Sequence, residues 1–137
     1  MPNEPCPGVL LHHSLPNGSA HFDLLLSRDP NPQDADARCL VSFRLNEPPE
    51  MHAAGAIDCH RMPDHRAHYL THEGEVGGGR GNVRRVGSYM VRWIEDSADA
   101  ARFELRTDAG TAQCEASRVD AVGGWKMIVR PGAGAGR

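Results

Sequence analysis

The amino-acid sequence predicts a mainly β protein, a compact single-domain antiparallel β-barrel with little helix. Short apolar segments recur along the chain, and glycine, proline and asparagine turn signals separate them. No apolar pattern with a 3.6-residue period persists for three helical turns. A length of 137 residues corresponds to one domain. Many short strands at this spacing are typical of a sandwich or barrel.

The expected strands are residues 8–11, 20–26, 39–45, 82–86, 88–94, 102–106, 113–116 and 125–130. The first two form a hairpin around a turn at 15–18. Residues 28–38 and 46–55 are expected to be loops, and 65–70 a helical turn or an extended segment. The domain organisation predicted is an N-terminal extension at 1–8, the barrel domain at 9–130, and a disordered Gly/Ala tail at 131–137.

The sequence argues against several classes of protein: membrane-spanning, secreted, and those built on paired-cysteine motifs. No apolar run approaches the roughly 20 residues that span a bilayer, and the first residues show no basic and apolar leader. We therefore expect a cytoplasmic protein with no membrane partner. The four cysteines form no C-x-x-C pair, which argues against a zinc ribbon or thioredoxin-like motif. We expect them to be free thiols that pack as small apolar side chains.

Charge is unevenly distributed although the net charge is only -3. Residues 61–92 carry six arginines against three acidic residues, namely Arg61, Arg66, Arg80, Arg84, Arg85 and Arg92. This locally basic segment could face phosphate or form a solvated strand face.

Histidine is concentrated in the first half of the chain. All 8 histidines lie between His12 and His72. Histidine is the commonest metal ligand and the usual proton carrier near neutral pH. The asymmetry therefore places any such chemistry in this half.

A candidate metal site lies in the first predicted hairpin. Residues two apart on a strand share a face, so His21 and Asp23 project together while Phe22 and Leu24 point toward the core. A facial metal site needs a third ligand, which the partner strand of the hairpin can supply.

The length of the hairpin loop decides which histidine is that ligand. A two-residue loop at 17–18 would place His12 opposite Asp23, whereas an odd loop centred on Asn17 would place His13 opposite His21. Pro16 cannot donate a ladder hydrogen bond. It therefore favours the longer loop and His13, with His12 as the alternative.

Three segments carry ordered motifs: paired histidine strands over 13–23, the run D-H-R-A-H-Y-L-T-H-E-G over 64–74, and G-R-G over 79–81. Together they resemble the 3′-phosphoesterase domain of bacterial DNA ligase D, most closely its short stand-alone relatives. The resemblance runs from about Val9 to Arg130, nearly the whole chain.

The resemblance implies a β-barrel that holds a divalent metal, typically Mn2+, with Zn2+ or another transition metal as an alternative. It implies His13, His21 and Asp23 as metal ligands, and His65 and Tyr69 as the catalytic pair that contacts the scissile phosphate. The implied activity removes 3′-phosphates and 3′-terminal ribonucleotides from DNA or RNA–DNA ends before ligation. A separate ligase or polymerase is the protein partner that such an activity would serve.

The chain departs from this family among the residues that bind substrate. The family's arginine two residues after the aspartate is Leu25 here. The lysine loop of the larger domain is replaced by residues 44–49, which contain no lysine. The phosphate-binding cation is therefore expected among three other arginines: Arg66, Arg80 and Arg84.

Other motifs favour structural roles. The glycine run at 77–81 lacks the ending of a nucleotide P-loop and opens no helix, so we expect a tight turn with positive φ or a turn that presents Arg80 to substrate. His68 and His72 are expected to be peripheral. Trp93 and Trp125 are expected to pack in the core, with base stacking as the alternative.

The leading hypothesis is thus a metal-dependent 3′-phosphoesterase, a hydrolase of DNA repair. The alternatives are a non-catalytic module that binds metal or phosphate, and a phosphoesterase for a small phosphorylated metabolite. A basic groove beside the metal would favour nucleic acid, and a closed narrow pocket would favour a metabolite.

Overall fold

The computed structural model describes residues 4–49 and 54–132. Strands dominate these residues, and the single helical element is a 3-10 helix of four residues. The elements in chain order are β1 (Cys6–Ser14), β2 (Ala20–Ser27), β3 (Leu40–Leu45), β4 (Gly55–His65), η1 (Ala67–Leu70), β5 (Gly74–Glu75), β6 (Asn82–Asp96), β7 (Ala100–Thr107), β8 (Gly110–Arg118) and β9 (Gly124–Pro131). The predicted mainly β fold with little helix is confirmed.

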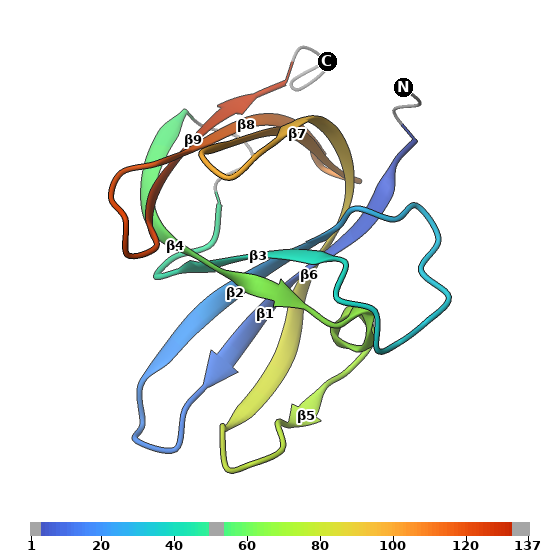
Figure 1. Cartoon of the computed structure of the whole chain (residues 1–137), viewed down its shortest axis with the longest axis vertical. Coiled ribbons are helices and arrows are strands. Elements are labelled where there is room, and N and C mark those ends of the chain that lie inside the picture. The colour runs from blue at the N-terminus through green and yellow to red at the C-terminus, as the bar shows by residue number, and fades with distance from the viewer. Residues whose placement is uncertain (1–3, 50–53, 133–137) are drawn as a thin grey trace.

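The strands form one antiparallel sheet that closes on itself (Figure 1). Its order is β1-β2-β3-β4-β9-β8-β7-β6, and β1 also pairs with β6 to complete the ring. The short β5 adds to the N-terminal end of β6, outside the ring. Closure leaves the eight ring strands without a free edge. The predicted antiparallel barrel is therefore confirmed as a barrel-like closed sheet.

The main core lies inside this ring and takes alternate side chains from every ring strand. Phe43, Phe103 and Met127 are among its fully buried members. Trp125 is buried in the same cluster and Trp93 packs against it, which confirms the core packing expected of both. Burial of this aromatic and aliphatic surface is the main source of stability.

A second apolar cluster lies on the outer face of the ring. Leu25 belongs to it, whereas its neighbours Leu24 and Leu26 belong to the main core, so β2 is buried on both faces. Tyr69 and Leu70 of η1 pack against this cluster. The outer cluster consists of Val9, Leu11, Leu25, Leu40, Val76 and Val83.

Several elements differ from the sequence-based expectation. The strand β4 was not predicted because it contains Pro63 and few large apolar residues. The two strands expected at 82–94 are one bent strand, β6, in which the register shifts opposite residues 10–11 and again after Trp93. These shifts are bulges, which bend a strand without ending it.

The two ends of the chain also differ in part from the predicted domain boundaries. β1 already begins at Cys6, within the segment expected to be an extension. Pro131 still belongs to β9, and residues 133–137 of the expected tail lie outside the described residues. Within the described residues, the only helix is far too short and polar to cross a bilayer.

The four cysteines are free thiols, as predicted. Cys6, Cys59 and Cys114 are buried, and Cys39 is half-buried. Burial raises the pKa of Cys59 and of Cys114 to about 12, so both stay protonated and act as apolar packing groups.

A network of two ion-paired arginines and two carboxylates ties β4 to the ends of β2 and β6. Arg28 binds both Asp64 and Asp96, and Arg61 binds Asp96 at 3.0 Å. The Arg61 guanidinium also lies over the rings of Phe43 and Trp125, at 5.6 and 5.0 Å from their centroids. Because Asp64 precedes His65, the network anchors the end of β4 from which that histidine projects.

The protonation of Asp96 links this network to pH. Partial burial by itself raises the pKa of Asp96, but hydrogen bonds from Arg28 and Arg61 outweigh that effect and lower the pKa. Because the pKa of Asp96 is lower in the folded than in the unfolded protein, its ionised carboxylate stabilises the fold at pH values above the unfolded-state pKa. This stabilisation is lost as the pH falls through the folded-state pKa.

We expect Asp96→Asn to lower the free energy of unfolding at pH 7 by about 1–2 kcal/mol. The difference from wild type should shrink below about pH 4, where Asp96 becomes protonated in the unfolded chain, and disappear as pH falls through the lowered folded pKa. Urea unfolding at pH 7 and pH 3 measures both values. Asp58→Asn is the control, since that exposed carboxylate lies 3.9 Å from Lys126 and should matter by less than roughly 0.5 kcal/mol. An equal loss at both pH values would contradict the linkage.

Candidate metal centre and its pocket

The β1–β2 hairpin has the odd loop centred on Asn17 that the sequence favoured. Ser14 pairs with Ala20, and His13 lies directly opposite His21. The Asn17 side-chain oxygen accepts hydrogen bonds from the amide and hydroxyl of Ser19, which closes the turn. This loop length therefore places His13, and not His12, on the face of the hairpin that carries His21.

The neighbouring His12 lies on the other face of β1. It stands opposite Phe22 in register, and the two rings meet edge to face with centroids 5.3 Å apart. Successive residues of a strand point to opposite faces, so His12 cannot join the group formed by its neighbour.

His13, His21 and Asp23 form a compact group that could hold a metal ion. One ligand atom from each lies within 4.8 Å of the others. Asp23 Oδ2 lies 3.2 Å from His13 Nδ1, and Asp23 Oδ1 lies 3.1 Å from His21 Nε2. His21 and Asp23 are buried and His13 is half-buried. Two imidazoles and a carboxylate make a typical facial donor set for a divalent transition metal.

The hydrogen bonding of His13 leaves a lone pair directed at Asp23. His13 Nε2 lies 2.7 Å from the Arg80 carbonyl oxygen, which can only accept, so Nε2 carries the hydrogen. In the neutral ring Nδ1 then has no hydrogen, and it faces a carboxylate oxygen that is also an acceptor. Two acceptors at 3.2 Å need a cation or a proton between them.

His21 also has a ring nitrogen that needs a cation or a proton beside it. Its buried Nε2 makes no hydrogen bond within the described structure, although Asp23 Oδ1 is 3.1 Å away. The proximity therefore lacks hydrogen-bond geometry. A buried nitrogen without a partner is costly. A metal ion shared by the three side chains satisfies both nitrogens and the carboxylate, so the residues fit such an ion.

The glycine turn at 77–81 supplies the carbonyl that orients His13. Gly81 has a φ of 99°, which side-chain-bearing residues rarely adopt, and a Cβ there would overlap the Ser14 carbonyl oxygen. This close approach places the turn against the end of β1 and brings the Arg80 carbonyl to His13. The turn with positive φ that the sequence predicted is confirmed.

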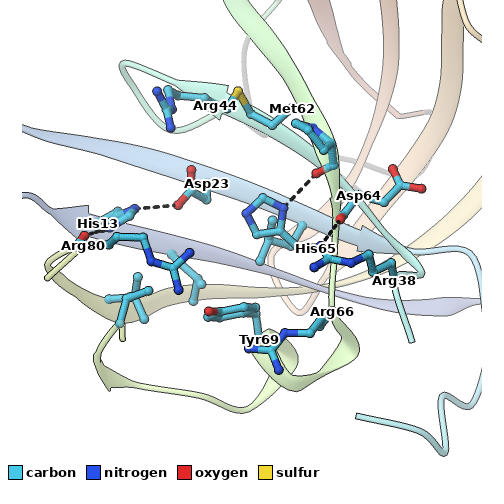
Figure 2. A pocket seen from close by; sticks show the side chains of 15 residues that line it. His13, Asp23, Arg38, Arg44, Met62, Asp64, His65, Arg66, Tyr69 and Arg80 are labelled. Atoms are coloured by element: carbon cyan, nitrogen blue, oxygen red, sulfur yellow. Dashed lines mark hydrogen bonds and ion pairs between the residues drawn. The ribbon is translucent and has the colours of Figure 1, made fainter. Parts of the chain in front are cut away.

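His13, His21 and Asp23 are called the metal group below. A pocket of about 530 Å³ opens beside these three side chains (Figure 2). Its floor is the outer apolar cluster, and its walls come from β3, β4, η1 and the glycine turn. The lining residues are Leu11, His13, Asp23, Leu25, Arg38, Arg44, Met62, Pro63, Asp64, His65, Arg66, Tyr69, Val76, Arg80 and Val83. Figure 2 shows His65 and Tyr69 facing the side of the pocket that holds His13 and Asp23.

The expected catalytic pair lies together in this pocket. The rings of His65 and Tyr69 meet edge to face with centroids 5.9 Å apart. His65 Nδ1 lies 3.0 Å from the Pro63 carbonyl oxygen and must donate to it. The neutral ring therefore carries its free lone pair on Nε2, which can accept a proton.

The structure brings two of the three expected phosphate-binding arginines to the pocket. Arg66 and Arg80 line it, while Arg84 is absent from the described lining. Arg84 lies opposite His12 in register, whereas its neighbour Val83 lies opposite His13. Because of this alternation, Arg84 projects from the face of the sheet opposite the metal group.

Sequence reasoning missed two arginines that line the pocket, Arg38 and Arg44. Arg44 lies on β3 directly opposite Asp23. Its position on the same face as Asp23 follows only from the β2–β3 register, which the sequence does not give. Leu25, which replaces the family's arginine, is fully buried in the pocket floor.

His68 and His72 lie outside the pocket lining of the described residues, as expected for peripheral side chains. Their ring centroids are 4.7 Å apart, and His72 Nε2 lies 2.8 Å from the Glu75 carbonyl oxygen.

No protein-family model matches this chain, and no curated protein matches it. The resemblance to the ligase D phosphoesterase domain therefore rests on the motifs alone.

We expect the wild-type protein to bind one Mn2+ per chain and to gain about 2.7 kcal/mol of stability at a hundredfold excess of metal over Kd. His13→Ala should weaken binding by roughly 100-fold or more, because it removes a ligand. His12→Ala, one residue away on the opposite face, should leave binding unchanged. Titration calorimetry and thermal unfolding with added Mn2+ measure these effects, and equal behaviour of the two variants would contradict the assignment.

We expect Gly81→Ala to weaken Mn2+ binding roughly tenfold, since it displaces the Arg80 carbonyl that orients His13. Gly77→Ala in the same turn is the matched control, because a Cβ there meets open space and its φ is ordinary. Calorimetric titration of both variants tests the role of the turn. Unchanged binding by Gly81→Ala would show that the carbonyl contact is dispensable.

Proposed function

We propose that this protein is a divalent-metal-dependent phosphoesterase that processes 3′ ends of nucleic acid, removing a 3′-phosphate or a 3′-terminal ribonucleotide. One observation carries the proposal: three segments far apart in the sequence, the β1–β2 hairpin, the β4–η1 segment and the glycine turn, line a single pocket. These are the three segments whose motifs resemble the ligase D phosphoesterase domain.

The proposed cofactor is Mn2+, held by His13, His21 and Asp23. A divalent ion bound there supplies Lewis-acid polarisation of a phosphoryl oxygen. Imidazole and carboxylate donors suit manganese, and they also suit zinc and iron.

The side chains around the metal group supply the remaining chemistry. His65 Nε2 can take a proton from the attacking water, and the imidazolium can return a proton to the leaving oxygen. The Tyr69 hydroxyl can donate a hydrogen bond to a non-bridging phosphoryl oxygen, where negative charge increases in the transition state. Arg80 can neutralise the same charge from the turn that orients His13.

The charge at the pocket favours nucleic acid over a small metabolite. Four arginines line it: Arg38, Arg44, Arg66 and Arg80. Arg38, Arg44 and Arg80 are exposed and Arg66 is half-buried, so these cations can also meet phosphates outside the pocket. Phosphate contacts of this kind supply sequence-independent affinity for a strand end.

We expect the wild-type protein with Mn2+ to convert a primer-template ending in 3′-phosphate, or in a single 3′-ribonucleotide, into one ending in a 3′-hydroxyl. His21→Ala should lower the rate by roughly 100-fold or more, since it removes a metal ligand. His12→Ala should keep wild-type activity. The products are resolved on denaturing gels, with EDTA as the metal-free control and protein made without a histidine tag.

The outcomes separate the functional alternatives. Product that requires both Mn2+ and His21 supports the phosphoesterase and defines its substrate. A wild-type protein that binds Mn2+ but releases no product from either end rejects the proposal, and the non-catalytic module or a small phosphorylated substrate then replaces it.

A further inference from the structure

Arg44 lines the pocket at the edge of the metal group and is unpaired among the described residues. It projects from the same face as Asp23, because the two residues are directly opposite in the β2–β3 register. Arg44 is exposed, and among the described residues no hydrogen bond or ion pair engages its guanidinium. In Figure 2 the guanidinium groups of Arg44 and Arg80 lie on either side of the Asp23 carboxylate.

The position opposite Asp23 would normally produce an ion pair. Here both oxygens of Asp23 face histidine nitrogens, Oδ2 toward His13 at 3.2 Å and Oδ1 toward His21 at 3.1 Å. The carboxylate is thus committed to the metal group. Within residues 4–49 and 54–132, no carboxylate forms an ion pair with Arg44 beside that group.

The other arginines of the pocket are already engaged. Arg66 binds Asp36 at 3.2 Å and lies over the Tyr69 ring. Arg80 Nε donates to the Gly77 carbonyl at 2.6 Å. Arg38 donates to the Asp64 carbonyl at 3.4 Å. Arg44 is therefore the pocket arginine whose whole guanidinium is available to a ligand.

We infer that Arg44 binds the phosphomonoester group of the ligand beside the metal group and makes the protein selective for a phosphorylated strand end. A guanidinium presents parallel N–H donors that match two phosphate oxygens. A terminal phosphate carries more charge and more free oxygens than an internal phosphodiester. This inference rests on the proposed function, because it takes a phosphate ester as the ligand.

The test measures binding of two oligonucleotides that differ only in a 3′-phosphate or a 3′-hydroxyl. Fluorescence anisotropy with Mn2+ is carried out in a His65→Gln background, which removes the proton carrier and leaves the metal ligands intact. The parent should prefer the 3′-phosphate end. Arg44→Met should reduce that preference roughly tenfold, and Arg44→Lys should retain part of it, because charge remains but the bidentate contact is lost.

Two controls show that the effect is local. Arg102→Met removes one exposed arginine from β7, outside the pocket, and should leave the preference unchanged. Mn2+ binding by Arg44→Met, measured by calorimetry, should equal that of wild type. Equal binding shows that the variant is folded and that the metal group is intact.

In the active protein, Arg44→Met should raise KM for the 3′-phosphate end. A variant with wild-type preference and wild-type KM overturns the inference while leaving the phosphoesterase intact. A parent without preference for the 3′-phosphate end also overturns it. A preference that depends on Arg44, in a protein that releases no product, supports the inference and rejects the phosphoesterase, so the two failures are distinguishable.

Discussion

The register of the β1–β2 hairpin is the constraint on which the candidate site depends. Side chains alternate between faces, so a slip of one residue would move His21 and Asp23 from the outer face into the main core. Two features hold the register. The Asn17 turn sets the loop length, and β2 is buried on both faces, with Leu24 in the main core and Leu25 in the outer cluster. A slip would exchange these two leucines and would bury the carboxylate of Asp23 among apolar side chains, which is strongly unfavourable.

The second layer on the outer face converts this register into a pocket. Tyr69 and Leu70 of η1 pack against the outer apolar cluster, and Val76, between β5 and the glycine turn, belongs to it. The same packing brings Tyr69 over the cluster and the Arg80 carbonyl to His13. Burial of apolar surface thus positions polar groups that have no direct contact with the main core. The ion pairs of Arg28 with Asp64 and Asp96 then fix the end of β4, from which His65 projects.

Local pattern was enough to predict the elements that carry the metal group. Period-two alternation placed His21 with Asp23, and Pro16 favoured the loop that selects His13. The motifs around His65 and Tyr69 were found by resemblance, and the structure places both in one pocket with the metal group.

The arginines were harder to predict, because the face from which each one projects depends on strand pairings that the sequence does not display. Arg84 and Val83 are neighbours, and only the β1–β6 register shows which of them shares a face with His13. Arg44 required the β2–β3 register, and residues 28–39 separate those strands. The strand β4 was missed because its few apolar residues and Pro63 resemble a loop.

The positions of Leu25 and Arg44 explain why, under the proposed function, the cation beside the metal group would come from β3 in this chain. Leu25 is fully buried in the pocket floor, where Leu11 and Val83 also lie. A guanidinium at that position would lose its hydration or disrupt the cluster that η1 covers. Arg44 lies one strand away, directly opposite Asp23 and diagonal to Leu25. A diagonal neighbour across two strands is within reach of a long side chain. From this exposed position the guanidinium can reach a ligand on the metal group while remaining hydrated, and the floor stays apolar. Under the proposed function, separating the apolar floor from the charged rim would let phosphate-binding residues change without altering the packing that holds His13, His21 and Asp23 in place.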